Sequence, residues 1–180
     1  MTSTACVRLL VLMGLAASAP HPVALAREGT IERLLDERAI IALADRLDAA
    51  VDRKDWDAAR AAFAPTIEVD LSAAGGPTGR MPSDELIGMW ETNLFEEKTS
   101  FHLRGNHIVA FEGANQARLT SSAYAWNRLD GLPGGALWEV WGQYDYEVER
   151  SDAGWVITDF TFVPTHDRGN RVVPGAPRPQ

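Results

Sequence analysis

Histidine, carboxylate and tyrosine side chains are the residues of this sequence with the widest chemical scope. The chain has 180 residues, of which 4 are histidines and only 1 is a cysteine. A single cysteine cannot form an intramolecular disulfide, a thiolate zinc site or a ligand set for an iron–sulfur cluster. We therefore look for chemistry among His, Asp, Glu, Tyr and Asn.

Asp52 and His102 are the first candidates. Asp52 ends a segment with helical periodicity, and His102 begins a strand-like segment whose pleat places His102, Arg104 and Asn106 on one face and His107 on the other. If Asp52 points toward the sheet, its carboxylate fixes the imidazole tautomer and makes His102 a general base. The alternative is structural, with Asp52 capping the next turn and His102 a hydrogen-bonded, partly buried side chain.

Three further polar side chains lie on segments that alternate apolar and polar residues. Tyr144 and Tyr146 share the apolar face of segment 137–149, where a phenol can donate to a carbonyl or a leaving hydroxyl. Two ordinary core tyrosines explain this pattern equally well. Asn127 shares a face with small residues, which suits a polar group beside a ligand, but it could also be solvated near a strand end.

The elements that must position these residues are helices first and strands afterwards. We predict a helix from an N-cap at Thr30 to about Lys54, a short helix capped by Asp55 and stopped by Pro65, and a third helix opened by Pro82. Strand-like alternation covers 66–71, 100–111, 116–128, 137–149 and 155–163. This order predicts an α+β domain in which about three N-terminal helices are covered by a curved antiparallel sheet.

The two ends of the chain have different compositions. Arg8, an apolar run over 9–17 and Ala24-Leu25-Ala26 predict a signal peptide over 1–26, cleaved after Ala26, and export to the periplasm or the medium. An uncleaved N-terminal extension is the alternative. The run is shorter than the roughly 20 residues of a membrane span. The predicted domain then occupies 27–166, and we expect the Gly-, Pro- and Arg-rich segment 167–180 to be a flexible tail.

The charge balance bears on partners. With 17 Lys and Arg against 25 Asp and Glu, the net charge of -8 argues against nucleic acid as a partner and against binding to an anionic membrane surface after signal cleavage.

We expect no metal site, because His102 and His107 face opposite ways on a regular strand and His166 lies in the terminal region.

Several motifs resemble one known family. Together they cover about residues 30–165 and resemble the SnoaL-like proteins of the nuclear transport factor 2-like superfamily, and scytalone dehydratase most within it. The motifs are 52–57, 63–66 with the strand to Asp70, 82–89, 101–106 and Gly154-Trp155. The resemblance implies a cone-shaped fold with a deep apolar pocket and cofactor-free chemistry. It also implies that Asp52 and His102 form the pair that moves a proton in the elimination of water.

Departures from the dehydratase pattern concern the rest of the pocket. Val51 and Leu71 stand where the family has tyrosines, Asn127 falls on its second histidine, and Tyr144 lies near its pocket asparagine. We therefore expect a rebuilt shell in which Tyr144 is the replacement donor. The residues expected to bind substrate are Asn127, Tyr124, Trp90, Phe101, Phe160 and Asp70.

Three hypotheses for function follow. The first is a cofactor-free dehydratase, lyase or isomerase acting on a small hydrophobic cyclic ketone or polycyclic alcohol through the Asp52–His102 pair. The second is an exported protein that binds a small hydrophobic molecule without converting it. The third and weakest is an aldol reaction like that of polyketide cyclases, with Asp70 or Asp145 as the acid–base group. We also expect a homodimer or homotrimer formed through the sheet.

Overall fold

The computed structural model describes residues 22–178, with residues 22–29 described only as backbone. The predicted signal peptide therefore lies largely outside the described residues. The chain divides into two units, Met1–Arg33 and Leu34–Gln180, and the described part of the first unit is helical. None of the described helices has both the length and the apolar character needed to cross a membrane. The elements discussed below belong to the second unit, apart from the first turns of α1.

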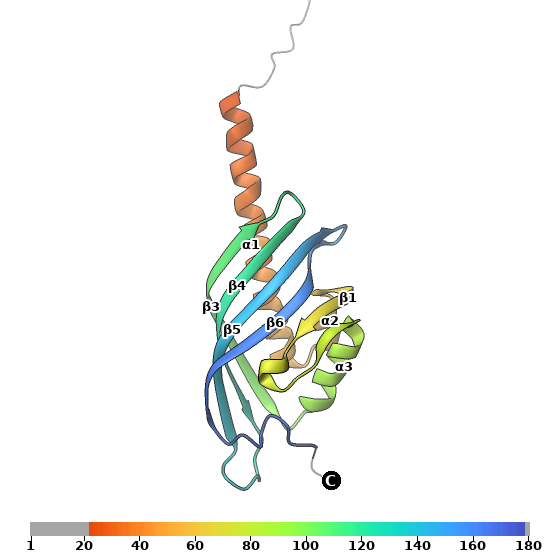
Figure 1. Ribbon diagram of the computed structural model, residues 1–180, viewed down its shortest axis with the longest axis vertical. Helices are drawn as coiled ribbons and strands as arrows, with labels where there is room; N and C mark the ends of the chain where they lie inside the picture. Colours follow the sequence, from red (N-terminus) through yellow and green to blue (C-terminus); the bar gives the residue numbers. More distant parts are fainter. Residues whose placement is uncertain (1–21, 179–180) are drawn as a thin grey trace, which may run out of the picture. The chain divides into compact units, whose positions relative to one another are not determined.

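Three helices precede most of the sheet, as predicted (Figure 1). Helix α1 spans Pro22–Arg53, so it begins before Thr30, while α2 spans Trp56–Arg60 and α3 spans Ser83–Asn93. Lys54 adopts a left-handed φ of 59°, which ends α1 directly after the turn that carries Asp52. The Asp55 side chain accepts a hydrogen bond from the Ala58 N–H at 3.1 Å, so it caps α2.

A single six-stranded sheet completes the fold in the order β2-β1-β6-β5-β4-β3. Neighbouring strands are antiparallel except β1 and β6, which are parallel. The predicted α+β class is therefore confirmed, and β2 is a short strand that the alternation did not predict. The bounds are β1 Phe63–Asp70, β2 Thr78–Pro82, β3 Thr99–Phe111, β4 Gln116–Arg128, β5 Leu137–Ser151 and β6 Gly154–Gly169.

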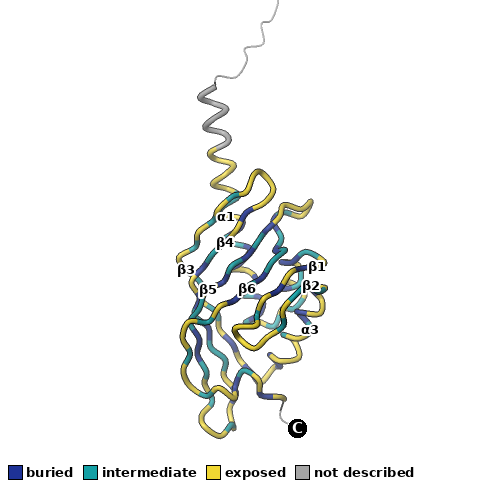
Figure 2. The backbone as a smooth tube through the Cα atoms, viewed as in Figure 1, coloured by how far each residue is buried: buried dark blue, intermediate teal, exposed yellow. Residues whose placement is uncertain are grey.

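The core lies between the second half of α1 and the inner face of the sheet. Alternate residues of the long strands are buried, as Figure 2 shows along β4, β5 and β6. Leu47 on α1, Leu119 on β4, Tyr146 on β5 and Ile157 on β6 are each at most 2% exposed and belong to one hydrophobic cluster. Burial of such side chains at about 25 cal/mol per Å² holds the helix on the sheet.

A β-bulge in β3 changes the side on which one histidine lies. The register with β4 shifts between Gly105 and Ile108, and Asn106 has a left-handed φ of 53°. The extra residue turns His107 inward, where Nδ1 lies 2.8 Å from Oγ of the fully buried Ser121. Our expectation that His102 and His107 face opposite ways was wrong, because it assumed a regular strand.

The C-terminal segment is packed rather than loose. Strand β6 continues to Gly169, beyond the expected domain end at 166, and Val173 and Ala176 are buried in a small cluster with Phe95 and Leu129. The ammonium of Lys98 donates to the carbonyls of Pro174 at 3.2 Å and Ala176 at 2.8 Å. A flexible tail from residue 167 therefore does not describe residues 167–176.

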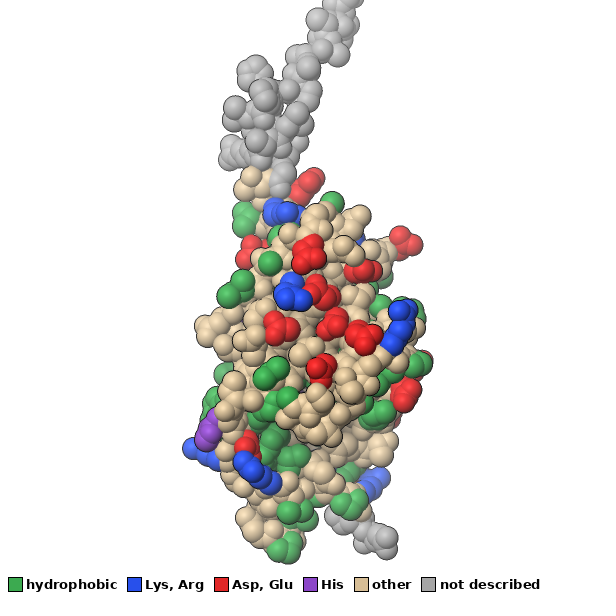
Figure 3. Space-filling model, viewed as in Figure 1, with side chains coloured by type: hydrophobic (Ala, Val, Ile, Leu, Met, Phe, Trp, Pro, Cys, Tyr) green, Lys and Arg blue, Asp and Glu red, His purple; other side chains and the backbone are tan. Residues whose placement is uncertain are grey.

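Acidic side chains gather on the outer face of the sheet (Figure 3). Asp145 and Glu147 of β5 lie beside Asp159 of β6 around a shallow depression. Burial raises the pKa of the Asp159 carboxyl, and the neighbouring Glu147 and Glu68 raise it further against a hydrogen bond from Thr161. Much of the acid excess thus lies on the outside of the sheet.

Candidate functional site

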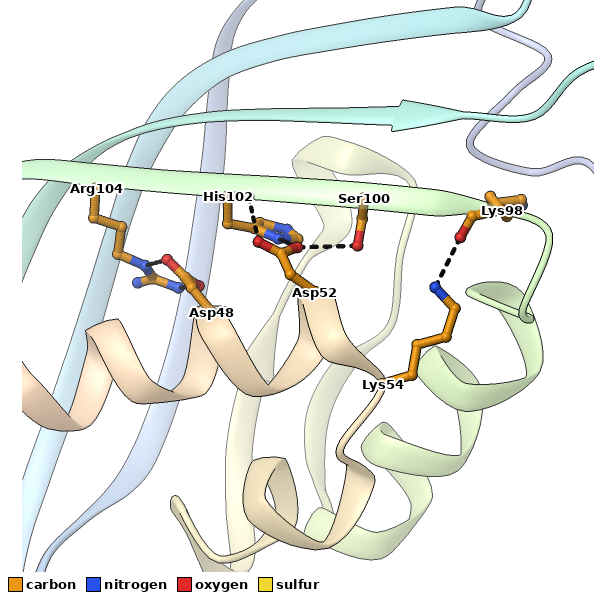
Figure 4. A network of polar contacts seen from close by, with 7 residues as sticks. All are labelled: Asp48, Asp52, Lys54, Lys98, Ser100, His102 and Arg104. Atoms are coloured by element: carbon orange, nitrogen blue, oxygen red, sulfur yellow. Dashed lines mark hydrogen bonds and ion pairs between the residues drawn. The ribbon is translucent and has the colours of Figure 1, made fainter.

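Asp52 and His102 are in direct contact (Figure 4). Oδ1 of Asp52 lies 2.7 Å from Nδ1 of His102, and Oδ2 accepts the backbone N–H of His102 at 2.8 Å. The Ser100 hydroxyl donates to Oδ1 at 3.0 Å. Asp52 thus binds the ring, the backbone and the neighbouring hydroxyl of one strand, which restrains the imidazole.

The contact belongs to a row of charged side-chain pairs between α1 and the edge strand β3. Asp45, Asp48 and Asp52 are spaced by three and four residues on α1 and so share one face of the helix. They face His107, Arg104 and His102 of β3, respectively. The bulge at Asn106 keeps the third pair in line, with Asp45 Oδ1 3.6 Å from His107 Nε2.

The electrostatics of the pair favour an ionised Asp52. Burial acts to raise the pKa of this carboxyl, but the hydrogen bonds and charge of His102 and the hydrogen bond of Ser100 outweigh it. The pKa of Asp52 therefore lies below its ordinary value of 3.8. Both side chains retain limited solvent contact, with exposed fractions of 18% for Asp52 and 17% for His102.

A cavity of about 450 Å³ lies against His102. This volume falls in the range of about 300–1,000 Å³ that is typical of small-molecule sites. His102 contributes to the wall, whereas Asp52 is not among the lining residues and lies behind the imidazole. The apolar part of the wall comes from Leu47, Val51, Leu71, Leu86, Met89, Trp90, Leu94, Phe160, Phe162 and Pro174.

Asp48 and Arg104 also line this cavity, and the sequence analysis did not select them as site residues. Nη2 of Arg104 lies 2.6 Å from Oδ1 of Asp48, and Nε contacts Oδ2. The signals were present in the sequence: Asp48 precedes Asp52 by one helical turn, and Arg104 follows His102 on the same strand face. Neither spacing says that the two side chains meet.

Tyr144 lies in the cavity wall, on the inner face of β5. Burial raises the pKa of its phenol to about 12, although the adjacent Arg104 acts to lower it. The phenol is therefore neutral at physiological pH and keeps its proton as a hydrogen-bond donor. Trp90 and Phe160 line the same cavity, with ring centroids 5.5 Å apart.

Four residues expected to bind substrate are not among the cavity-lining residues. Asp70 is exposed and accepts hydrogen bonds from its neighbour Ser72. Phe101 is exposed and stacks on Trp126, while the Tyr124 hydroxyl donates to Glu139 at 2.7 Å. Phe101 and Tyr124 alternate with inward residues of β3 and β4. Asn127 lies opposite Ser100, near the end of β4.

The family model for the SnoaL-like domain matches residues 32–161. Comparison with curated proteins gives no match. The fold resembles that of the Kfla4162 protein from Kribbella flavida, with a TM-score of 0.72, 20% identity and coverage of 80% of this chain and 99% of that one.

Two further solved structures carry enzyme names. A protein assigned as a scytalone dehydratase from Novosphingobium aromaticivorans has a TM-score of 0.68 at 22% identity, covering 79% of this chain and 93% of that one. Hexachlorocyclohexane dehydrochlorinase LinA-type3 from Novosphingobium barchaimii has a TM-score of 0.64 at 16% identity, covering 79% and 94%. At these identities the likeness concerns the fold. The match to the family model spans most of the chain, and the protein therefore belongs to the SnoaL-like family.

Proposed function

We propose that this protein is a cofactor-free lyase or isomerase that acts on a small hydrophobic cyclic ketone or polycyclic alcohol. The observation that carries the proposal is the 2.7 Å contact between Asp52 Oδ1 and His102 Nδ1, with His102 in the wall of an apolar cavity. The carboxylate holds the proton of the ring on Nδ1, so the lone pair of the imidazole is on Nε2. A positioned base of this kind contributes about 10²- to 10⁴-fold in rate.

The proposed reaction begins at a carbon next to a carbonyl. Nε2 of His102 takes the proton, and the electron pair of the C–H bond forms an enolate. In a dehydration the enolate then re-forms the carbonyl, a C=C bond forms, and the C–O bond at the β-carbon breaks. The departing hydroxide takes the proton back from the imidazolium and leaves as water. In an isomerisation the same proton returns to another carbon of the substrate.

The names of two neighbouring structures support this choice of reaction, whereas the cavity wall bears on the choice of substrate. The neighbouring structures named as a dehydratase and a dehydrochlorinase bear the names of eliminations, of water and of hydrogen chloride respectively. Val51 and Leu71, which line the cavity here, stand where the dehydratase pattern has tyrosines. The proton-transfer pair is thus combined with a more apolar wall, which favours a different substrate.

A fluorogenic β-hydroxy ketone tests the proposal. 3-Hydroxy-1-tetralone loses water to give 1-naphthol after tautomerisation, and the naphthol is detected by its fluorescence. We expect the wild-type protein to form naphthol and the His102→Ala variant to lose this activity, with melting temperatures within a few degrees of each other. Equal rates for the two proteins would contradict the proposal. If His102→Ala does not fold, His102 has a structural role, and the activity of a folded His102→Gln variant then shows whether His102 is also needed for catalysis.

Binding without conversion is the second candidate, and the apolar replacements at Val51 and Leu71 favour it. It requires that wild-type protein and the His102→Ala variant hold the same ligand and that neither converts it. The aldol alternative has weaker support, since Asp70 and Asp145 lie outside the cavity lining. We further propose that the protein works after export and that copies associate through the sheet, which size measurements on the purified protein would test.

A further inference from the structure

Arg104 is the most deeply enclosed charged group of the cavity wall. Its side chain is 2% exposed, and its guanidinium carbon lies 3.9 Å from the centroid of the Tyr144 ring and 4.8 Å from that of Tyr146. Asp48 holds the Nε and Nη2 edge in a two-point contact. The guanidinium is therefore fixed in position by a carboxylate on one edge and aromatic rings over its face.

The opposite nitrogen of this guanidinium forms no hydrogen bond of regular geometry among the described residues, although the Tyr146 hydroxyl lies near the guanidinium. Nη1 of Arg104 is buried without a hydrogen bond to any described residue. A buried donor left unsatisfied typically costs about 1–3 kcal/mol, so such groups in folded proteins usually have a water or a ligand as their partner. Because Arg104 belongs to the cavity wall, a molecule in the cavity is one candidate partner, and the hydroxyl of Tyr146, which also lacks a hydrogen bond, is the other.

The charges around the cavity indicate which ligand this donor suits. Asp48 already balances Arg104, while Asp52 behind His102 is ionised. With a neutral imidazole these groups sum to one negative charge, so a carboxylate ligand would meet net repulsion. A neutral acceptor, such as a carbonyl oxygen, can take the free N–H without that repulsion.

We propose that Arg104 binds the carbonyl oxygen of a neutral ligand and stabilises the negative charge that forms on this oxygen when His102 removes the neighbouring proton. This inference rests on the proposed function and names the electrophilic partner of the His102 base. Asp48 is then a positioning residue, which holds the guanidinium through its two-point contact. Tyr144 supports Arg104 through its ring, in addition to any role of its hydroxyl.

The spacing on β3 suits this division of labour. His102 and Arg104 are two residues apart on one strand face, so their Cα atoms are separated by roughly 7 Å. Both side chains are fixed by carboxylates from successive turns of α1. A base and an oxyanion donor are thus held on the same side of one cavity, as enolisation requires. A preorganised donor of this kind is typically worth about 10²- to 10³-fold in rate.

Ligand preference tests the inference without relying on turnover. The probes are 1-tetralone, the hydrocarbon tetralin, and 1,2,3,4-tetrahydro-2-naphthoate as the carboxylate, with binding measured by calorimetry and the carbonyl stretch of bound 1-tetralone by infrared difference spectroscopy. The variant is Asp48→Leu with Arg104→Met, which removes both charges together and leaves no unpaired buried carboxylate. Arg168→Met is the matched control, because Arg168 also pairs with a carboxylate, Glu139, and lies over an aromatic ring, Trp141, outside the cavity lining.

We expect wild-type protein and Arg168→Met to prefer 1-tetralone over both other probes and to lower its carbonyl frequency. In the double variant the preference for 1-tetralone over tetralin should fall by about 10- to 100-fold, and the carbonyl frequency should return toward its value in solvent. If the double variant does not fold, Arg104→Lys serves instead, since it keeps the charge but loses the two-point geometry, and the same loss of preference is expected.

Three results would overturn the inference: a wild-type protein that binds none of the probes, one that binds 1-tetralone and tetralin equally, or variants that retain the preference. The last result would mean that Nη1 is satisfied inside the protein, with the likewise unpaired hydroxyl of Tyr146 as the nearest candidate. Failure of the proposed function gives a different result. Exchange of the α-protons of 1-tetralone in deuterated water would then not depend on His102, whatever the binding preference.

Discussion

Asp52 holds His102 at two points, through the ring nitrogen Nδ1 at 2.7 Å and through the backbone N–H at 2.8 Å. Each carboxylate oxygen takes one of these two contacts with His102, so the imidazole and the strand that carries it are fixed relative to the last turn of α1. An arrangement that only closed a surface ion pair would not need the backbone contact. The same two-point hold recurs one helical turn earlier, where Asp48 takes two nitrogens of Arg104.

The Asp52→Asn variant should lose most of the proposed activity while keeping its fold. The amide fills the same space but cannot accept from both the ring and the backbone as the carboxylate does, so the tautomer and charge of the pair are lost. We expect turnover of 3-hydroxy-1-tetralone to fall by about 10²- to 10⁴-fold. Asp57→Asn is the control, because Asp57 is exposed on α2 and pairs only with Arg60 there. A similar loss in both variants would contradict a specific role for Asp52.

Acid unfolding should register the Asp52 contact. The folded-state pKa of Asp52 is lowered, so its contribution to stability is present above the ordinary value of 3.8 and is lost as pH falls through the lower folded-state pKa. We expect the wild-type advantage over Asp52→Asn in free energy of unfolding to shrink as pH falls through this window. Urea titrations at a series of pH values measure it, and an advantage that grows toward acid pH would refute the assignment.

Gly142 on β5 should be intolerant of a methyl group. A Cβ there would lie 2.6 Å from the Phe162 ring and 2.6 Å from the Val163 carbonyl oxygen, and Phe162 is part of the cavity wall. We expect Gly142→Ala to destabilise the protein by about 1–3 kcal/mol and to lower its affinity for 1-tetralone. The matched substitution Gly88→Ala lies in α3 with open space around it, so it should raise stability by about 0.5–1 kcal/mol. Thermal melts of the two variants should therefore shift in opposite directions.

Lys98 should hold the C-terminal part of the cavity wall. Its buried ammonium donates to Asn93 Oδ1 at 2.8 Å and to the Pro174 and Ala176 carbonyls, and Pro174 and Gly175 line the cavity. We expect Lys98→Met to cost about 1–3 kcal/mol through the carbonyls left unpaired and to speed hydrogen exchange in residues 173–176. Lys54→Met is the comparison, because Lys54 contacts only the Lys98 carbonyl at 3.1 Å. Equal exchange in both variants would argue against the proposed hold.

Export can be checked on the N-terminus of the secreted product. We expect protein from the periplasm or medium of a bacterial host to begin at Arg27, as mass spectrometry of the intact chain would reveal. Ala26→Arg should block cleavage, because the peptidase reads small residues at this position. A full-length chain recovered from the cytoplasm in both cases would contradict the predicted signal peptide.

The local pattern of apolar, polar and capping residues in the sequence was sufficient to predict the fold class. Alternation over the four long strands, the cap at Asp55 and the break at Lys54 depend on neighbours within a few residues, and these elements lie close to where the sequence analysis placed them. The same local reasoning placed the two tyrosines of β5 inward and Asp52 at the end of its helix. The family match agrees with this, since the order of elements is a property of the whole chain.

The predictions that were wrong concern features that depend on which other segment of the chain packs against a given one. The bulge at Asn106 turned His107 inward, and the packing of Val173 against Phe95 ordered a segment whose composition suggested a loose tail. Phe101 and Tyr124 were wrongly expected at the cavity, because each alternates with inward residues of its strand and therefore points to the outer face of the sheet.

Within the regular parts of α1 and β3, the sequence by itself determined which side chains share a face, because helical and strand periods follow from backbone geometry. It placed Asp48 and Asp52 on one side of α1 and His102 and Arg104 on one side of β3. Only the tertiary structure decided that these two faces meet, pairing Asp52 with His102 and Asp48 with Arg104. That choice depends on the crossing of a helix over the edge strand of a six-stranded sheet, which is set by the burial of the core as a whole rather than by any one segment.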